Sequence, residues 1–109
     1  MEIETINQNS YIVLQIKEDL SPKSDLTVLK DQIKAYLDSG SIKIALSFTE
    51  KSYFHTQTIS ALVQCVEYVN EKGGKLAIIN PNAEIRDVLD TISLDKLVDV
   101  FPSIESIGK

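Results

Sequence analysis

Short apolar stretches alternate along the chain with longer segments whose apolar residues recur every three or four positions. An almost wholly apolar stretch, such as residues 11–16, is typical of a strand covered on both faces. The spacing of three and four puts side chains on one face of a helix. Strands that alternate with helices form units with parallel strands and right-handed crossovers. The alternation therefore predicts an α/β fold with a mixed, mostly parallel sheet of about five strands.

The first half of the chain predicts a hairpin, a helix and a strand. Ser21 suits a helix N-cap and Pro22 the first helical position, because the N–H that proline lacks has no partner there. Gly40 is expected to end this helix in a left-handed conformation. The expected elements are hairpin strands over 3–6 and 11–16, a helix beginning at Pro22, and a strand over 42–48. The inner face of the helix is expected to contain Leu26, Leu29, Ile33, Tyr36 and Leu37.

The second half predicts two further helices, each followed by a strand. Asn82 is expected to cap the last long helix, with Glu84 favourably placed in its first turn. The expected elements are a helix over 56–72, a strand over 76–79, a helix after Asn82, a strand over 97–101 and a helical stub over 104–107. The inner stripes are expected to contain Ile59, Leu62, Val63, Val66 and Val69 in one helix and Ile85, Val88, Leu89 and Ile92 in the next. The element order is β-β-α-β-α-β-α-β, with a final helical stub.

Length and composition place the chain among ordinary globular proteins. A chain of 109 residues with 43% hydrophobic and 25% charged residues is expected to form one domain over residues 1–109. The net charge of −5 argues against a nucleic-acid partner, because phosphate contacts need clustered basic residues. The sequence contains no apolar run long enough to cross a membrane and no signal-peptide pattern. A cytoplasmic protein without membrane insertion is expected.

The side chains that usually perform chemistry are scarce. Cys65 lies in the middle of a predicted helix, where we expect a packed side chain rather than a reactive thiol. His55 is the single histidine, and one cysteine with one histidine does not make a zinc site. Neither a G-x-S-x-G elbow nor a glycine-rich phosphate loop is present in the sequence. The sequence therefore predicts a non-catalytic protein with no metal and no cofactor.

Several segments, in order and over essentially the whole chain, resemble the STAS domain, a family that includes the bacterial anti-sigma factor antagonists. Each motif is weak alone, and their ordered sum is fairly specific. The resemblance implies a single mixed sheet with helices packed mainly on one face. The segments that carry it are 20–22, 42–54 and 73–82, followed by Ile85, Val88, Leu89, 94–97 and Val100–Phe101.

In that family a hydroxyl at the start of the second helix is phosphorylated by a partner serine kinase that also acts as an anti-sigma factor. The family segment reads Asp-Ser-Ser/Thr-Gly-Leu. Aligned on residues 53–54, with Ile59 and Leu62 downstream, it puts His55 at the aspartate, Thr56 at the first hydroxyl, Gln57 at the phosphoacceptor and Thr58 at the glycine. Gln57 departs from the family because a carboxamide cannot accept a phosphoryl group.

Three interpretations of this segment stay open. Gln57 could hold the surface permanently in its unmodified, binding-competent form, Thr56 or Thr58 could be the phosphoacceptor instead, or the switching role could be lost. A structural interpretation stands beside them, in which Thr56 caps its helix. His55 is either an exposed loop residue or part of an interface. Residues 53 and 54 are expected to be one buried and one partly exposed side chain.

The resemblance implies a regulatory protein that docks on an anti-sigma factor/serine kinase or another regulatory protein, as a monomer or weak dimer. The alternatives are a STAS subunit beside a transporter ATPase and a ligand-sensing module. A helix N-terminus with unpaired N–H groups favours an anion, so a phosphate there would block a partner without unfolding the helix. The expected partner-binding residues are Ser21, Pro22, Ser52, His55, Thr56, Gln57, Thr58, Ser60 and Gln64.

Overall fold

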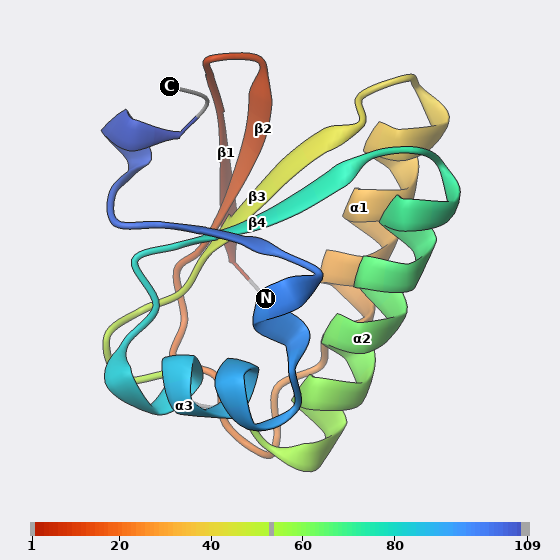
Figure 1. The fold of residues 1–109 in the computed structure, drawn as a ribbon. Coiled ribbons are helices and arrows are strands. Elements are labelled where there is room, and N and C mark those ends of the chain that lie inside the picture. The colour runs from red at the N-terminus through yellow and green to blue at the C-terminus, as the bar shows by residue number, and fades with distance from the viewer. Residues whose placement is uncertain (1, 53, 108–109) are drawn as a thin grey trace.

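The computed structural model describes residues 2–52 and 54–107, and Figure 1 shows their arrangement. Helices and strands alternate as the periodicity predicts. Strands are β1 Ile3–Gln8, β2 Tyr11–Ile16, β3 Lys43–Ser47, β4 Lys75–Ile79 and β5 Asp99–Phe101; helices are α1 Thr27–Asp38, α2 Thr56–Glu71 and α3 Ala83–Thr91, with short 3₁₀ turns η1 Leu94–Lys96 and η2 Ile104–Ser106.

The five strands of the described residues lie in sequence order across one sheet. β1 and β2 are antiparallel, and every later neighbour is parallel. Because the parallel strands are added in one direction through right-handed crossovers, each connecting helix falls on the same side of the sheet. Figure 1 shows α1, α2 and α3 on that side. The expected mixed sheet with helices mainly on one face is confirmed.

The hairpin has longer strands than the sequence predicts. Asn9 and Ser10 form its two-residue turn, and both have positive φ, at 49° and 74°. Asparagine tolerates this conformation well, and a pair of positive φ angles matches the twist of a tight hairpin. Residues 7 and 8, expected in the turn, therefore pair with β2.

The sheet buries apolar side chains on both faces. The larger core lies between the sheet and the helices, and its inner strand residues include Leu14, Ile44, Leu46 and Ile78. A smaller cluster lies on the opposite face, where Ala45 and Ala77 leave room for the segment around η2 to cover the sheet. That cover includes Ile104 and the fully buried Ile107.

The first helix begins five residues later than the sequence predicts, at Thr27 rather than Pro22. Ser21 and Ser24 form a closed turn, in which the Ser24 N–H donates to the Ser21 carbonyl and the Ser21 N–H donates to the Ser24 hydroxyl, both at 3.0 Å. This turn uses the hydrogen-bonding groups that a helix start at Pro22 would need. Asp25 then accepts from the Thr27 N–H at 2.9 Å, just where the helix begins.

Two other differences concern element boundaries and the inner face of α2. The last strand begins at Asp99 rather than residue 97, because η1 and the residues after it turn the chain first. The buried residues of α2 are Thr58, Leu62, Cys65, Val66 and Val69, so Ile59 and Val63 are only partly buried. The predicted cap of α3 is confirmed, since the Asn82 side chain accepts from the Ile85 N–H at 2.8 Å.

Gly74 generates the first testable prediction, because the chain passes close to another backbone there. A Cβ at this position would lie 2.3 Å from the Ile42 carbonyl oxygen. We expect Gly74→Ala to lower the free energy of unfolding by about 2–3 kcal/mol, as overpacking against backbone does. Gly73→Ala meets no atom within 4 Å but keeps a φ of +74°, so its expected cost is about 1–2 kcal/mol. Urea unfolding of both variants measures the difference, and equal stabilities would contradict the close approach at Gly74.

Candidate functional site

The loops that follow the parallel strands gather at one end of the sheet, at the bottom of Figure 1. They comprise residues 17–26, 48–55 and 80–82, and the second of these leads directly into α2. In open α/β sheets the carboxyl ends of the strands are where ligands and partners usually bind. Most of the residues that the sequence analysis predicts to bind a partner lie at this edge.

The Ser52 side chain is completely buried and ties two of these loops together. Its Oγ accepts the Leu20 N–H at 2.9 Å and lies 2.7 Å from the Thr49 hydroxyl. The Thr49 hydroxyl donates a hydrogen bond to the Asp19 carboxylate. In the contact between the two hydroxyls, Ser52 is therefore the donor and Thr49 the acceptor. The hydroxyl therefore satisfies polar groups of both the first and the second loop.

Asn82 adds the third loop to this network. Its Nδ2 donates to the Glu50 carbonyl at 2.9 Å and to the Ser52 carbonyl at 2.6 Å, while its Oδ1 caps α3. One side chain therefore holds the start of α3 against the loop that precedes α2. The sequence predicted the cap but not these two bonds, because they join residues about thirty positions apart.

Phe54 anchors the chain just before α2. Its ring is buried and meets Phe48 edge to face, with ring centroids 5.2 Å apart. Leu26 and Leu62 line the same small apolar space beneath α1 and α2. Phe54 is thus the buried member of the expected pair, whereas Tyr53 lies outside the described residues.

His55 occupies the N-cap position of α2, and its φ of −85° and ψ of 170° are extended. The expectation that Thr56 caps the helix is wrong, because Thr56 is already the first helical residue. Thr56 and Gln57 are exposed, whereas Thr58 is 5% exposed. The first turn of α2 therefore presents Thr56 and Gln57 to solvent, together with the N–H groups that every helix start leaves unpaired.

Gln57 and the first loop border one surface hollow. Its lining includes Pro22, Lys23 and Ser24 from the loop, Lys30 from α1, and Gln57 and Ala61 from α2. The family resemblance implies a partner surface that includes both Pro22 and Gln57, and in the structure both residues line this hollow. Ser21 is partly buried in the turn described above.

Two expected partner-binding residues are not on this surface. Ser52 is fully buried because its hydroxyl carries the loop network, and Thr58 is buried because it belongs to the inner stripe of α2. Ser60 and Gln64 are both exposed on α2, and Gln64 lies on the side that faces Lys30 of α1. The exposed residues of the predicted surface are therefore Pro22, Thr56, Gln57, Ser60 and Gln64. Ser21 and His55 are partly buried.

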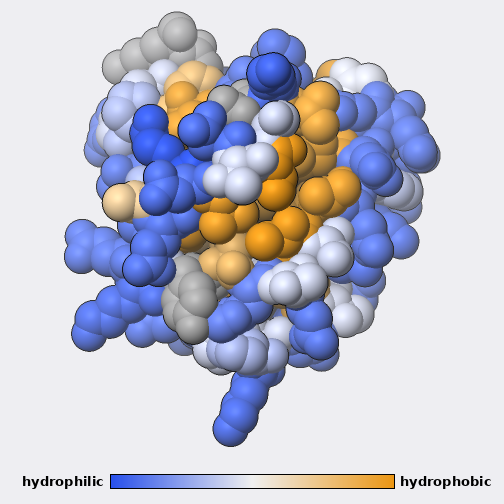
Figure 2. All heavy atoms as spheres, turned by 60° about the horizontal axis from the view of Figure 1, so that its bottom comes forward, coloured by the Kyte–Doolittle hydropathy of each residue, from blue (hydrophilic) through white to orange (hydrophobic). Residues whose placement is uncertain are grey.

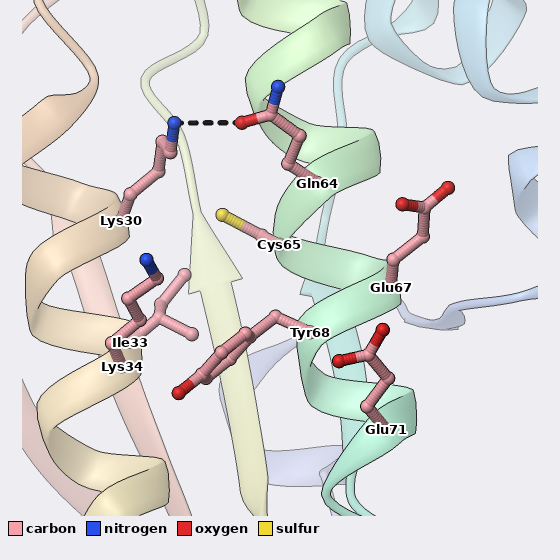
Figure 3. A pocket seen from close by; sticks show the side chains of 8 residues that line it. All are labelled: Lys30, Ile33, Lys34, Gln64, Cys65, Glu67, Tyr68 and Glu71. Carbon is pink, nitrogen blue, oxygen red and sulfur yellow. Dashed lines mark hydrogen bonds between the residues drawn. The ribbon is translucent and has the colours of Figure 1, made fainter.

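A groove runs between α1 and α2, and Figure 3 shows the side chains that line it. Lys30 Nζ donates to the side-chain Oε1 of Gln64 at 2.8 Å across the groove. The Cys65 sulfur lies between the helices, and burial raises the pKa of its thiol to about 11. Such a thiol stays protonated at neutral pH, which supports the prediction of a packed rather than a reactive cysteine.

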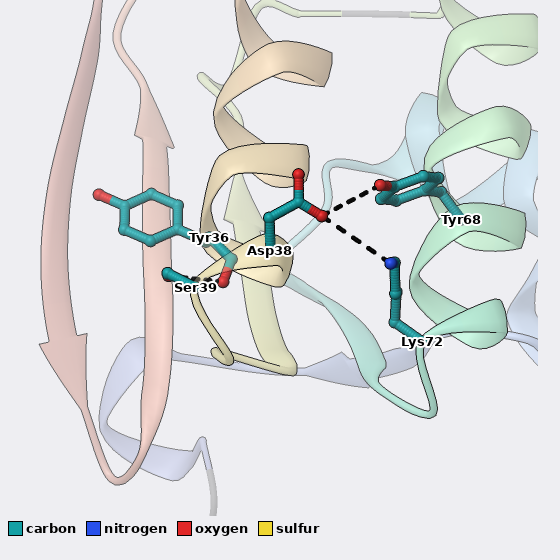
Figure 4. Close-up of polar contacts among 5 residues, drawn as sticks. All are labelled: Tyr36, Asp38, Ser39, Tyr68 and Lys72. Carbon is teal, nitrogen blue, oxygen red and sulfur yellow. Dashed lines mark hydrogen bonds and ion pairs between the residues drawn. The ribbon is translucent and has the colours of Figure 1, made fainter.

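Polar contacts at the other end of the groove join the same two helices, as Figure 4 shows. The Tyr68 hydroxyl donates to Asp38 at 3.3 Å, and Lys72 lies 3.9 Å from the same carboxylate. Lys34 and Lys72 approach the Tyr68 ring to 5.3 and 5.7 Å from its centroid. The Ser39 hydroxyl donates to the Tyr36 carbonyl at 2.8 Å and helps end α1. The side of α2 that faces α1 is thus held by direct contacts.

Ser52→Ala tests whether the buried hydroxyl supports this edge. The substitution leaves the Leu20 N–H buried without an acceptor, and the expected loss in unfolding free energy is about 1–3 kcal/mol. Ser60→Ala, on the exposed side of α2, is the matched control and is expected to change stability by less than about 0.5 kcal/mol. Chemical denaturation measures both. A Ser52→Ala protein as stable as the control would show that the network contributes nothing.

The described residues contain neither a helix long and apolar enough to cross a membrane nor a cluster of histidine, cysteine and acidic side chains able to hold a metal ion.

Comparison with known proteins identifies the family. The STAS domain model matches residues 2–107. A Thermotoga maritima protein described as "Putative anti-sigma factor antagonist" is 22% identical over 96 residues, which cover 88% of this chain and 85% of that protein.

Solved structures show the same fold. The crystal structure of a Thermotoga maritima protein described as a "putative anti-sigma factor antagonist" superposes with a TM-score of 0.80 at 19% identity, covering 94% of this chain and 87% of that one. The phosphorylated form of the Bacillus cell fate determinant SpoIIAA superposes with a TM-score of 0.64 at 10% identity, covering 91% and 90%. With nearly its whole length matched, and with the strand order and helix placement that the family's fold requires, the chain belongs to the STAS domain family.

Proposed function

We propose that this protein is a regulatory, non-catalytic STAS domain of the anti-sigma factor antagonist kind, acting in the cytoplasm. It docks on an anti-sigma factor/serine kinase, or on a regulatory protein of the same role, through the start of α2 and the neighbouring loop. The observation that carries the proposal is Gln57, which is exposed in the first turn of α2 and borders the same hollow as Pro22 and Lys23. Gln57 stands at the family's phosphoacceptor position.

The construction of this edge suits a docking surface. Phe54 and Ser52 are buried and fix the loop from inside, so the exposed residues that follow are held in place before a partner arrives. A preformed surface loses little conformational entropy on binding. Described residues here offer few of the groups that catalysis needs, and the one cysteine is buried away from the hollow.

The carboxamide of Gln57 determines which interactions and modifications are open to this position. It can donate and accept hydrogen bonds to a partner, but it cannot be phosphorylated. We therefore propose that the surface is permanently competent for binding. Among the neighbouring threonines, exposure favours Thr56 over Thr58 as a second possible acceptor, because a kinase must reach the hydroxyl.

A charge at position 57 is expected to disrupt docking. Gln57→Glu keeps the size of the side chain and adds a negative charge where the helix dipole tolerates it, so folding is expected to be unchanged. We expect a loss of at least about tenfold in affinity for the kinase-like regulator captured from the source bacterium, since a like-charged or desolvated carboxylate in an interface costs more than 1.4 kcal/mol. Calorimetry on the purified pair measures it.

The matched control is Asn7→Asp, which makes the same change from amide to carboxylate on an exposed residue of β1, far from the proposed surface. Its affinity is expected to equal that of the unmodified protein. If Gln57→Glu binds as tightly as the control, or if no regulatory protein is captured at all, the docking proposal is wrong.

Restoring a hydroxyl at position 57 tests the family register. With ATP and the captured kinase, Gln57→Ser is expected to gain one phosphate, as the serine oxygen attacks the γ-phosphorus, ADP leaves and the hydroxyl proton is released. The unmodified protein is expected to keep its mass. A phosphate on the unmodified protein that is lost in Thr56→Ala would instead identify Thr56 as the acceptor, and mass spectrometry distinguishes these results.

A further inference from the structure

The strand β1 is the first strand of the sheet and pairs with β2 on one side only. The helix α1 connects β2 to β3 and therefore lies above those two strands rather than above β1. Thr5 and Asn7 of β1 are exposed accordingly. An edge strand of this kind presents a row of unpaired N–H and C=O groups, which another strand can pair with.

The ladder of the hairpin determines which backbone groups point to this edge. The Lys17 N–H donates to the Glu2 carbonyl at 2.9 Å, and in an antiparallel ladder such hydrogen-bonded pairs alternate with pairs that are not bonded. Every second residue from Glu2 onward therefore bonds to the β2 side. Ile3, Thr5 and Asn7 direct their N–H and C=O groups the other way, where no described residue bonds to them.

The strand lacks most of the features that protect sheet edges from pairing. Natural edges are blocked by proline, by lysine, by bulges or by short length. The six residues of β1 include no proline and no lysine, and they pair with β2 in one continuous register. The one charged residue, Glu4, lies 3.8 Å from Lys17 of the same chain. At the other edge of the sheet, β5 has only three residues, so β1 is the edge that is open to pairing.

The side chains of β1 are complementary to a second copy of β1 in one antiparallel register. When Thr5 lies opposite Thr5 of the second copy, Ile3 lies opposite Asn7 and Glu4 lies opposite Ile6. Every outward N–H group of Ile3, Thr5 and Asn7 then meets an outward C=O group. No two like charges are directly opposite each other, and such pairs are the ones that destabilise a sheet.

The neighbouring two-fold registers fit less well. A pair centred on Glu4 puts two carboxylates directly opposite each other, which is unfavourable. A pair centred on Ile6 puts Ile3 opposite Asn9, which belongs to the turn and has a positive φ. The register centred on Thr5 therefore uses the strand most fully. Because this match depends on the order of the residues in β1 itself, it favours an identical strand as the partner.

We propose that β1 pairs with β1 of a second copy of this chain, antiparallel and about a two-fold axis at Thr5. The axis is perpendicular to the sheet, so the two sheets become one and the helices of both copies lie on the same side. One edge strand buries less than the roughly 800 Å² per partner of a standard interface, so the dimer is weak. None of the β1 residues lines the hollow beside Gln57, and the pairing therefore goes beyond the proposed docking and does not depend on it.

Amide hydrogen exchange at two protein concentrations tests the pairing directly. The Thr5 and Asn7 amides are expected to exchange several-fold more slowly at about 1 mM than at about 10 µM protein, because they are bonded only in the dimer. The Glu4 and Ile6 amides, which bond within the hairpin, are expected to change little and serve as internal controls. Exchange at Thr5 and Asn7 that does not depend on concentration would overturn the proposal.

Sedimentation equilibrium over the same concentrations compares two lysine variants. The unmodified protein is expected to shift from monomer toward dimer. Thr5→Lys is expected to stay monomeric, because two ammonium groups would lie opposite each other at the axis, and to fold normally, because Thr5 is exposed. Thr91→Lys makes the same exchange at the exposed last residue of α3 and is expected to dimerise as the unmodified protein does. An unmodified protein that is still monomeric at about 1 mM would contradict the pairing.

Two cysteine variants test the register. Oxidation by glutathione disulfide, which takes up the two electrons, is expected to cross-link Thr5→Cys into a dimer, because paired Cα atoms about 5.5 Å apart are within disulfide range. Asn7→Cys is the matched control, since its copy lies four positions farther along the strand, about 13 Å away and out of reach. The native Cys65 is buried and present in both variants. Equal cross-linking of the two variants would show that the register is wrong.

A further variant distinguishes β1 from another surface of the molecule. Figure 2 shows an apolar area between α2 and α3, surrounded by hydrophilic side chains, and Ile92 at the end of α3 is 39% exposed. Ile92→Ser is expected to leave the dimer unchanged. A dimer that is lost in Ile92→Ser but kept in Thr5→Lys would overturn the proposal. Because no step uses the kinase or position 57, failure here leaves the proposed docking at Gln57 standing, and the converse holds.

Discussion

The start of α2 depends on a small set of buried hydrogen bonds at the carboxyl end of the sheet. The Ser52 hydroxyl and the Asn82 carboxamide join three loops that come from three different strands. Buried polar groups of this kind cost little when every partner is in place and much when one is missing. The edge is therefore expected to keep its geometry only while all of these hydrogen bonds are in place. The exposed first turn of α2 follows directly after this network and is held in place by it, although none of its own side chains belongs to the network.

The fold could be predicted from the sequence because each element carries its own periodic pattern. Residues of β2 are apolar almost throughout, and Leu29, Ile33 and Leu37 repeat at helical spacing and are all buried. The beginning of α1 could not be predicted in the same way. A serine before a proline has equal local reasons to start a helix or a turn, and the bonds between Ser21 and Ser24 decide for the turn. Local rules fail where two local solutions compete.

The site was predictable to a similar extent. Register against the family segment predicts that position 57 lies in the first turn of the second helix, and Gln57 is exposed there. The burial of Ser52 and Thr58 could not be read from the sequence, because serine and threonine occur in cores, caps and surfaces alike. Whether a hydroxyl faces solvent depends on a partner far along the chain, as Leu20 is for Ser52. The predicted inner stripes were too wide for a related reason: Ile59, Val63 and Val88 fit the helical spacing but are only partly buried, and Ile92 is exposed.

In the function proposed above, Gln57 takes the place of the phosphorylated hydroxyl, so the control of binding lies with the partner and not with this protein. A phosphate at a helix N-terminus is electrostatically favourable for the helix itself, so a phosphorylation switch at this place acts on the partner and not on the fold. The proposed docking surface then has no hydroxyl at position 57 that a kinase could modify. Its occupancy then follows from the concentrations of the two proteins and from changes on the partner's side.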